Sequence, residues 1–242
     1  MHIRLFDTRD DVASAAAQRI ADALRSKPDL ILGLPAGQTP VPVYAELRRL
    51  HASGQLDFSR ATCFTIDEFV GLDRRHRGSF HAFVSEHLFS TVNVDPARVH
   101  SLDGAAMDVE RECERYEAAI AAAGGIDLQM LGLGSNGHVG FNEPGETLVA
   151  GTHRVTLLDE TRRNNAGHFG GDVNQVPREA LSMGMGTILK ARAILMSATG
   201  ELKAKPVEQM VRGPITTRMP ASFLQLHSRV ELCLDRLAGS RL

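Results

Sequence analysis

An imidazole and a carboxylate, His138 and Glu143, lie close together in a glycine-rich stretch of this sequence. The stretch follows an apolar run over 126–133 and contains Gly132, Gly134, Gly137 and Gly140. This pattern is typical of a buried strand that ends in a loop, and ligands bind at the carboxyl ends of strands in open α/β sheets. Histidine, with an ordinary pKa of about 6.5, can take up or release a proton near neutral pH, and a glutamate can orient it. We therefore expect proton-transfer chemistry at this loop.

Two adjacent carboxylates, Asp67 and Glu68, follow a second apolar run that ends at Ile66. One of the two can face a site while its neighbour points away from it. A carboxylate is a useful general base when it is partly removed from water, because burial raises its pKa toward the working pH. The alternative is a solvated pair that caps a helix, and the pair by itself favours this alternative.

The segment from Gly33 to Pro40 lies between a candidate strand and a candidate helix. Free backbone N–H groups and the positive end of a helix dipole suit a phosphate group, and Thr39 can add a hydroxyl donor. The segment is neither a P-loop nor a dinucleotide fingerprint, so nucleotide binding is not supported. The alternative is an ordinary turn in which Thr39 caps a helix with Pro40 in its first turn. Together, the three clusters suggest proton abstraction next to a carbonyl in a sugar phosphate.

Other kinds of site find little support. His138 and Glu143 have no further ligands at metal-binding spacing, and no Gly-x-Ser-x-Gly elbow is present. The three cysteines are scattered, which indicates neither a disulfide framework nor a zinc site. The net charge of −2 gives no reason to expect nucleic acid or a membrane surface as partner. No signal peptide or membrane span is recognisable, so we expect a cytoplasmic protein.

Short apolar runs alternate with helical patterns along the chain. Strands are predicted over 3–6, 30–34, 61–66, 128–133, 154–158, 193–197 and 230–234. Helices are predicted over 10–25, 39–53, 79–88, 107–123, 185–190 and 201–211. This alternation predicts an α/β fold with a doubly wound, mostly parallel sheet, in a single domain over 1–242. The weakly periodic segment 145–177 is either a lid over a site or a long surface connection.

At these motifs the chain resembles the glucosamine-6-phosphate deaminase/isomerase family over almost its whole length. The resemblance lies in six segments, at 33–40, 67–72, 132–144, 172–177, 180–186 and 220–224. It implies a modified Rossmann-like α/β fold with a mobile lid, here roughly residues 145–177. It also implies that glucosamine 6-phosphate is converted to fructose 6-phosphate and ammonia, without a metal or an organic cofactor.

The resemblance assigns roles to particular residues. His138, with Glu143 and Asn136, is implied to open the sugar ring, and Asp67 to move a proton between the carbon that bears the amine and its neighbour. The substrate-binding residues that it implies are Ala36, Gly37, Gln38, Thr39, Glu68, Gly137 and Lys203.

Two positions depart from the family pattern. Asn136 stands where some members carry aspartate, so Glu143 must supply the carboxylate for His138. Gly167 stands where members commonly carry an arginine that grips the phosphate, so a bidentate contact is missing. Three nearby side chains are candidates to replace it: Arg162, Arg163 and His168.

Other functions remain as alternatives. Galactosamine-6-phosphate deaminase/isomerases share much of the pattern and are the first alternative. A 6-phosphogluconolactonase is disfavoured by the Asn142-Glu143-Pro144 run and by the Asp67-Glu68 pair. A non-catalytic sugar-phosphate sensor with a DNA-binding helix-turn-helix is disfavoured because the first strand begins at Ile3.

The resemblance also bears on assembly and regulation. A homo-oligomer is compatible with the sequence. Hexameric family members carry an activator site for N-acetylglucosamine 6-phosphate. The segment 145–156, which would contribute to such a site, has Arg154 as its sole basic residue apart from His153, and the chain is short at its carboxyl end. We therefore expect little or no such activation.

Overall fold

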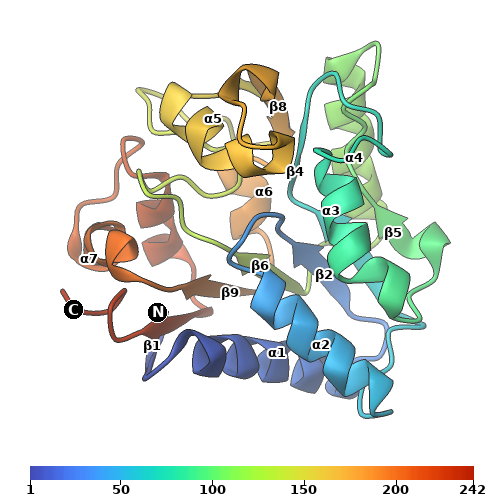
Figure 1. Cartoon of the computed structure of the whole chain (residues 1–242), viewed down its shortest axis with the longest axis vertical. Helices are drawn as coiled ribbons and strands as arrows, with labels where there is room; N and C mark the ends of the chain where they lie inside the picture. The colour runs from blue at the N-terminus through green and yellow to red at the C-terminus, as the bar shows by residue number, and fades with distance from the viewer.

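The computed structural model describes all 242 residues, which form an α/β fold around one central sheet (Figure 1). Its parallel strands lie in the order β1 (His2–Phe6), β10 (Val230–Asp235), β9 (Ala193–Ala198), β6 (Leu128–Leu131), β2 (Ile31–Leu34), β3 (Thr62–Thr65) and β5 (Val99–His100). The four central strands β9, β6, β2 and β3 are buried over their whole length. Burial on both faces explains why their sequences are mostly apolar and do not alternate between apolar and polar residues.

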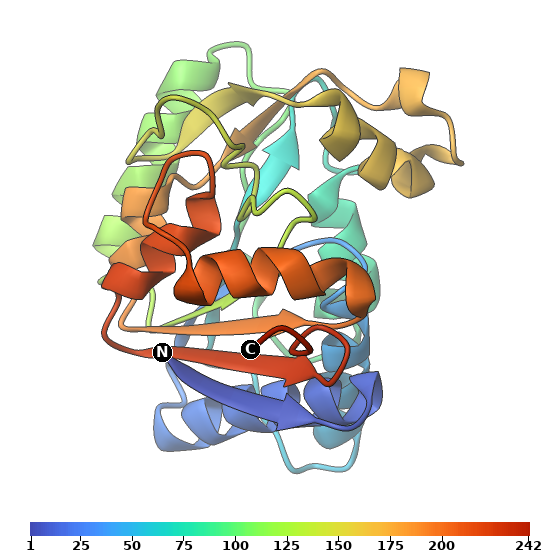
Figure 2. The ribbon, with the colours of Figure 1, turned by 90° about the vertical axis from the view of Figure 1, so that its left-hand side faces the viewer.

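Helices cover both faces of the central sheet. On one face α1 (Arg9–Ser26), α2 (Val41–Ala52) and α3 (Phe80–His87) share a hydrophobic core with the strands. On the other face α4 (Val109–Ala122), α6 (Met185–Leu189) and α7 (Ala204–Arg212) do the same. Figure 2 shows α1 below the strands β9, β10 and β1, and α7 above them. The predicted doubly wound, mostly parallel α/β fold is therefore confirmed.

A second, antiparallel sheet stands beside the carboxyl ends of the central strands. It contains β4 (Asp67–Phe69), β8 (Glu179–Ser182) and β7 (His153–Thr156), in that order. Only Ile66 separates β3 from β4, so the chain passes directly from one sheet to the other. After β7 come α5 (Asp159–Asn165) and the short 3-10 helix η3 (Ala166–Phe169). An aromatic cluster packs η3 and β4 together, and it includes Phe69, Phe80, Phe141 and Phe169.

Each predicted strand and helix is present, but the short elements β4, β5, β8 and α5 were not predicted. These elements have between two and seven residues, too few for a periodic pattern to stand out. The prediction that Thr39 caps α2 is wrong. The capping position belongs to Pro40, whose carbonyl accepts from the Tyr44 N–H at 2.8 Å, and no side chain caps this helix.

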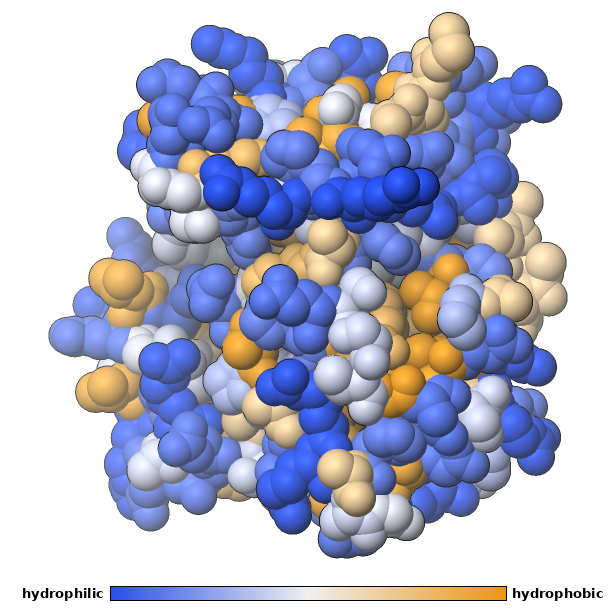
Figure 3. Space-filling model, turned by 45° about the vertical axis from the view of Figure 1, so that its right-hand side comes forward, coloured by the Kyte–Doolittle hydropathy of each residue, from blue (hydrophilic) through white to orange (hydrophobic).

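The surface is mixed in character. Figure 3 shows one face on which hydrophilic residues predominate and hydrophobic residues form small groups between them. The exposed large apolar side chains are scattered along the chain, and the most exposed are Met107 and Leu202. No helix combines the length and the apolar character that crossing a membrane requires.

Candidate active site

A cavity of about 300 Å³ opens where the central strands end. The loops that follow β2, β3, β6 and β9 line it, and these four strands are neighbours in the sheet. Because the strands are parallel, all four loops emerge at the same edge. The polar side chains along the cavity are Gln38, Thr39, Asp67, Ser135, His138, Asn164, Asn165, His168 and Lys203. The fold thus brings together the three polar clusters that stand far apart in the sequence.

Asp67 is the buried carboxylate of this cavity. Its residue is 6 % exposed, and no donor group of the protein hydrogen-bonds its side chain. Removal from water, with a smaller repulsion from Glu68, raises the pKa of Asp67 to about 8. A carboxyl with a pKa near neutrality and no internal partner can exchange a proton with a bound ligand, which is what a general base requires.

Glu68 points away from the cavity and holds the beginning of α3. One of its oxygens accepts from the backbone N–H groups of Phe69 and Phe80, at 2.8 and 2.9 Å. The other accepts from the Ser79 hydroxyl at 2.8 Å and the His81 N–H at 2.9 Å. All of its acceptor positions are therefore occupied by the protein, and this residue, predicted to bind substrate, has no contact with the cavity. The sequence left open that the two carboxylates form a solvated pair that caps a helix. Glu68 does cap a helix, but it is buried and not solvated.

His138, Asn136 and Glu143 form one connected group under the cavity. The His138 Nδ1 lies 3.7 Å from a Glu143 oxygen, which is too far for a hydrogen bond. Asn136 links the two, because its amide donates to the same Glu143 oxygen at 3.2 Å and its carbonyl accepts from the His138 backbone N–H at 3.2 Å. Burial lowers the pKa of His138, with Lys203 adding to this effect and Glu143 opposing it. The imidazole is therefore neutral near pH 7, so it can accept a proton and then pass it on.

Glycines in the loop after β6 make room for this histidine. A Cβ at Gly134 would lie 2.5 Å from ring atoms of His138, so no larger residue fits beneath the ring. Gly137 has a φ of +88°, and a Cβ there would lie 2.1 Å from the sulfur of Met219. The loop is thus tightly packed around the imidazole, although Gly137 itself does not line the cavity.

The loop after β2, the strand next to β6 in the sheet, also lines the cavity. Ala36, Gly37, Gln38 and Thr39 all line the cavity, as the sequence predicted for substrate-binding residues. The fully buried hydroxyl of Tyr44 donates to the carbonyl of Pro35 at 2.5 Å and so fixes the start of this loop.

Lys203 is the only lysine or arginine that lines the cavity. It lies in the short 3-10 helix η5 (Glu201–Lys203), directly after β9. Burial lowers its pKa, and the nearby Glu160 opposes this shift. A partly buried ammonium group at this edge of the sheet is suited to an anionic part of a ligand.

The segment predicted as a lid contacts the cavity through α5 and η3. Asn164, Asn165 and His168 line it from this side. The backbone N–H of Leu158, just before α5, donates to the second oxygen of Glu143 at 3.2 Å. The carboxylate beside His138 therefore also holds the start of the lid helix.

Several predicted or considered residues lie elsewhere. Arg162 donates to the backbone carbonyls of Val173 and Val176, at 2.9 and 3.0 Å, so its guanidinium is occupied by the protein. Arg163 does not line the cavity. Of the three residues proposed to replace the missing arginine, His168 alone reaches the cavity.

Sequence reasoning missed Ser135, Asn164 and Asn165 as cavity residues. Asn164 and Asn165 stand in the segment left open between a lid and a surface connection, where no periodicity distinguished an inward side chain from an outward one. Phe80 and Leu202 also line the cavity and carried no polar signal that could have identified them.

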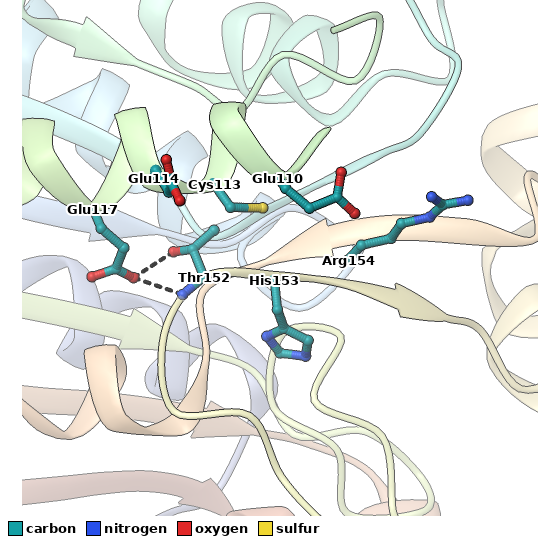
Figure 4. A pocket seen from close by; sticks show the side chains of 7 residues that line it. All are labelled: Glu110, Cys113, Glu114, Glu117, Thr152, His153 and Arg154. Carbon is teal, nitrogen blue, oxygen red and sulfur yellow. Dashed lines mark hydrogen bonds between the residues drawn. The ribbon is translucent and has the colours of Figure 1, made fainter. Parts of the chain in front are cut away.

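A second hollow, of about 560 Å³, lies between α4 and β7 (Figure 4). Its charged lining is mainly acidic: Glu110, Glu114 and Glu117 face it, together with Arg154. Arg154 is already bound to Glu179. This hollow contains no paired acid and base, and its glutamates suit an anion poorly. No group of three or more histidine, cysteine, aspartate or glutamate side chains in the protein is arranged to hold a metal ion.

Comparison with known proteins agrees with this geometry. The family model of glucosamine-6-phosphate isomerases and 6-phosphogluconolactonases matches residues 7–233. Glucosamine-6-phosphate deaminase 1 of Giardia intestinalis is 47% identical over 229 residues, which cover 95% of this chain and 86% of that protein.

Solved structures give the same result. A monomeric glucosamine-6-phosphate deaminase superposes with a TM-score of 0.97 at 39% identity, over the full length of both chains. The 6-phosphogluconolactonase of Trypanosoma brucei shares the fold, with a TM-score of 0.77 at 21% identity over 100% of this chain and 98% of that one. The chain therefore belongs to the family of glucosamine-6-phosphate isomerases and 6-phosphogluconolactonases.

Proposed function

We propose that this protein converts glucosamine 6-phosphate and water to fructose 6-phosphate and ammonia. The observation that carries the proposal is Asp67, a buried carboxylate without an internal partner that faces the same cavity as His138 and Lys203. A base, a neutral imidazole and a cation around one cavity suit proton transfer in a sugar phosphate. Relatives and a solved structure that are 39–47% identical to this chain carry the name glucosamine-6-phosphate deaminase.

In this proposal the phosphate binds first. The backbone of residues 36–39, the Thr39 hydroxyl and the ammonium group of Lys203 hold it at the edge of the sheet. Neutral His138 then accepts the proton of the anomeric hydroxyl and delivers a proton to the ring oxygen, which opens the pyranose. Asn136 holds the backbone N–H of His138 and the Glu143 carboxylate, and Glu143 favours the positive form that the imidazole takes on in this step.

Asp67 carries out the second stage. Its carboxylate removes the proton from the carbon that bears the amine and returns a proton to the neighbouring carbon. The amino aldose thereby becomes an imine of the ketose. Water adds to the imine carbon, and the carbon–nitrogen bond breaks to release ammonia and fructose 6-phosphate. The hydrogen and oxygen of one water molecule balance the reaction.

The direct test measures ammonia and ketose phosphate after incubation of the purified protein with glucosamine 6-phosphate. Galactosamine 6-phosphate and 6-phosphogluconolactone serve as parallel substrates, and we expect the first substrate to give the highest kcat/KM. Absence of ammonia from both amino sugars would contradict the proposal.

Asp67→Asn tests the assigned base. We expect turnover to fall by more than roughly 10⁴-fold, because the group that makes and breaks the carbon–hydrogen bonds is lost. Asp29→Asn is a matched control, since this aspartate is exposed near the opposite end of β2 and should leave turnover unchanged. Full activity of the Asp67 variant, with an unchanged circular dichroism spectrum, would show that another residue is the base.

A further inference from the structure

His168 presents an unpartnered imidazole to the cavity. The residue lies in η3, and its ring packs edge-on against Phe80 and Phe83, with centroid distances of 5.5 and 5.0 Å. These contacts fix the plane of the ring. Neither ring nitrogen forms a hydrogen bond within the protein, and the residue lines the cavity. The ring is therefore held in position while its polar atoms remain available.

The donors already assigned to the phosphate group, in residues 36–39 and Lys203, all come from the loops after β2 and β9, and none comes from the lid. Lys203 is the single lysine or arginine of the cavity, and it approaches from the sheet edge. A phosphate monoester has three terminal oxygens, each of which can accept more than one hydrogen bond. Asn164, Asn165 and His168 line the cavity from the lid, and Gly167 beside His168 adds no side chain.

His168 faces the same cavity as the loop that precedes α2. Ala36 of that loop and Ala166, two positions before His168, pack against the same aromatic cluster. Ala36 and His168 line one cavity. Burial lowers the pKa of His168, and a nearby His87 adds to this effect, so the ring is neutral near pH 7. A neutral imidazole keeps one N–H donor.

We propose that His168 donates a hydrogen bond to the phosphate group of the substrate from the lid side, while Lys203 binds the same group from the sheet side. The inference rests on the proposed function for the identity of the substrate. It makes His168 a binding residue, so its loss weakens ground-state and transition-state binding alike. KM should then rise while kcat stays nearly constant.

The test compares His168→Phe and His168→Gln with a matched control, His87→Phe. Phenylalanine keeps the aromatic packing against Phe80 and Phe83 but removes the donor, whereas glutamine keeps an N–H donor. His87 also packs against Phe83, at a centroid distance of 4.3 Å, and does not line the cavity. Assays at pH 8 keep His168 neutral, because burial lowers its pKa.

Two readouts are measured for each variant: KM and kcat with glucosamine 6-phosphate, and the dissociation constant of inorganic phosphate by calorimetry. We expect His168→Phe to raise KM and the phosphate dissociation constant by roughly tenfold, the loss of one hydrogen bond to a charged group. His168→Gln should stay within about threefold of the wild type, and His87→Phe should match it.

Unchanged KM and phosphate affinity in His168→Phe would overturn the inference, as would equal effects of the phenylalanine and glutamine variants. The phosphate measurement does not depend on turnover. Suppose that the wild type releases no ammonia, but His168→Phe still binds inorganic phosphate more weakly than the wild type does. The proposed function would then be refuted, and His168 would still be supported as a phosphate-binding residue.

Discussion

At the residue scale, two neighbouring carboxylates have opposite environments. Asp67 faces the cavity without an internal partner, whereas Glu68 accepts four hydrogen bonds from the start of α3. Their side chains diverge because successive residues of the strand β4 point to opposite faces. The sequence predicted that the pair could divide in this way, but only the pairing of β4 with β8 decides which residue faces the cavity.

The raised pKa of Asp67 predicts a pH-dependent effect of Asp67→Asn on stability. The folded pKa of about 8 lies above the ordinary value of 3.8, so between these limits the folded state holds a proton that the unfolded state has lost. The free energy of unfolding of the wild type therefore falls as pH rises from about 4 to 8. Asparagine does not ionise, so the variant does not lose this stability as the pH rises. We expect the variant to melt at least about 3 °C above the wild type at pH 9, and close to it at pH 4.5.

Thermal unfolding followed by circular dichroism at both pH values measures this difference. A variant that is destabilised equally at both values would show that Asp67 is not a buried, unpartnered carboxyl.

At the element scale, each wall of the cavity is fixed by a side chain from a neighbouring element. Tyr44 of α2 holds Pro35, and Glu143 holds both the Asn136 amide and the start of α5. The lid segment consists of one strand, one short helix and 3-10 turns, not of one irregular connection. Strand β7 is held by its pairing with β8 over four residues, so we propose that only the part with α5 and η3 moves as a lid.

Tyr44→Phe tests how the phosphate loop is positioned. The change leaves the buried carbonyl of Pro35 without a donor, which costs about 1–3 kcal/mol of stability. Because that carbonyl begins the loop, we also expect weaker binding of inorganic phosphate, measured by calorimetry. Tyr116→Phe is the matched control: this hydroxyl is also buried, and it donates to the carbonyls of Thr65 and His100, outside the loop.

The control should lose comparable stability in urea unfolding and keep its phosphate affinity. Equal phosphate affinities in the two variants would mean that the Tyr44 hydroxyl does not position the loop.

At the scale of the whole molecule, a cavity and a hollow of different character occupy separate regions. The cavity lies at the carboxyl ends of the central strands, and the acidic hollow lies between α4 and β7. Figure 4 shows Glu117 of the hollow hydrogen-bonded to Thr152. The carboxylate accepts from the Thr152 hydroxyl at 2.6 Å and from its backbone N–H at 2.7 Å. The segment 145–156, where hexameric relatives would bind an activator, contributes Thr152, His153 and Arg154 to this hollow.

We therefore predict that N-acetylglucosamine 6-phosphate does not activate the protein. Arg154 is bound to Glu179, and the unpaired Glu110 and Glu114 repel a phosphate group. Initial rates over a range of glucosamine 6-phosphate concentrations should be hyperbolic, with a Hill coefficient of about 1, with and without N-acetylglucosamine 6-phosphate. A sigmoidal curve that becomes hyperbolic on its addition would contradict this prediction.

The sequence alone determined the α/β class, the main strands and helices, the family, and the residues 36–39, Asp67, His138 and Lys203 as candidates around one site. Long apolar runs and local loop motifs carry this information, because burial on both faces of a sheet and the geometry of loops depend on neighbouring residues.

The tertiary structure decided what depends on contacts between distant segments. In the folded protein Glu68 points toward α3, and Arg162 donates to backbone carbonyls. His168 faces the cavity. The fold also joins His138 to Glu143 through Asn136, without a direct hydrogen bond. The direction of a side chain in a short element is set by the partner on which it packs. For these residues the packing partner comes from another sheet or from the lid. The neighbouring sequence therefore does not predict the direction of the side chain.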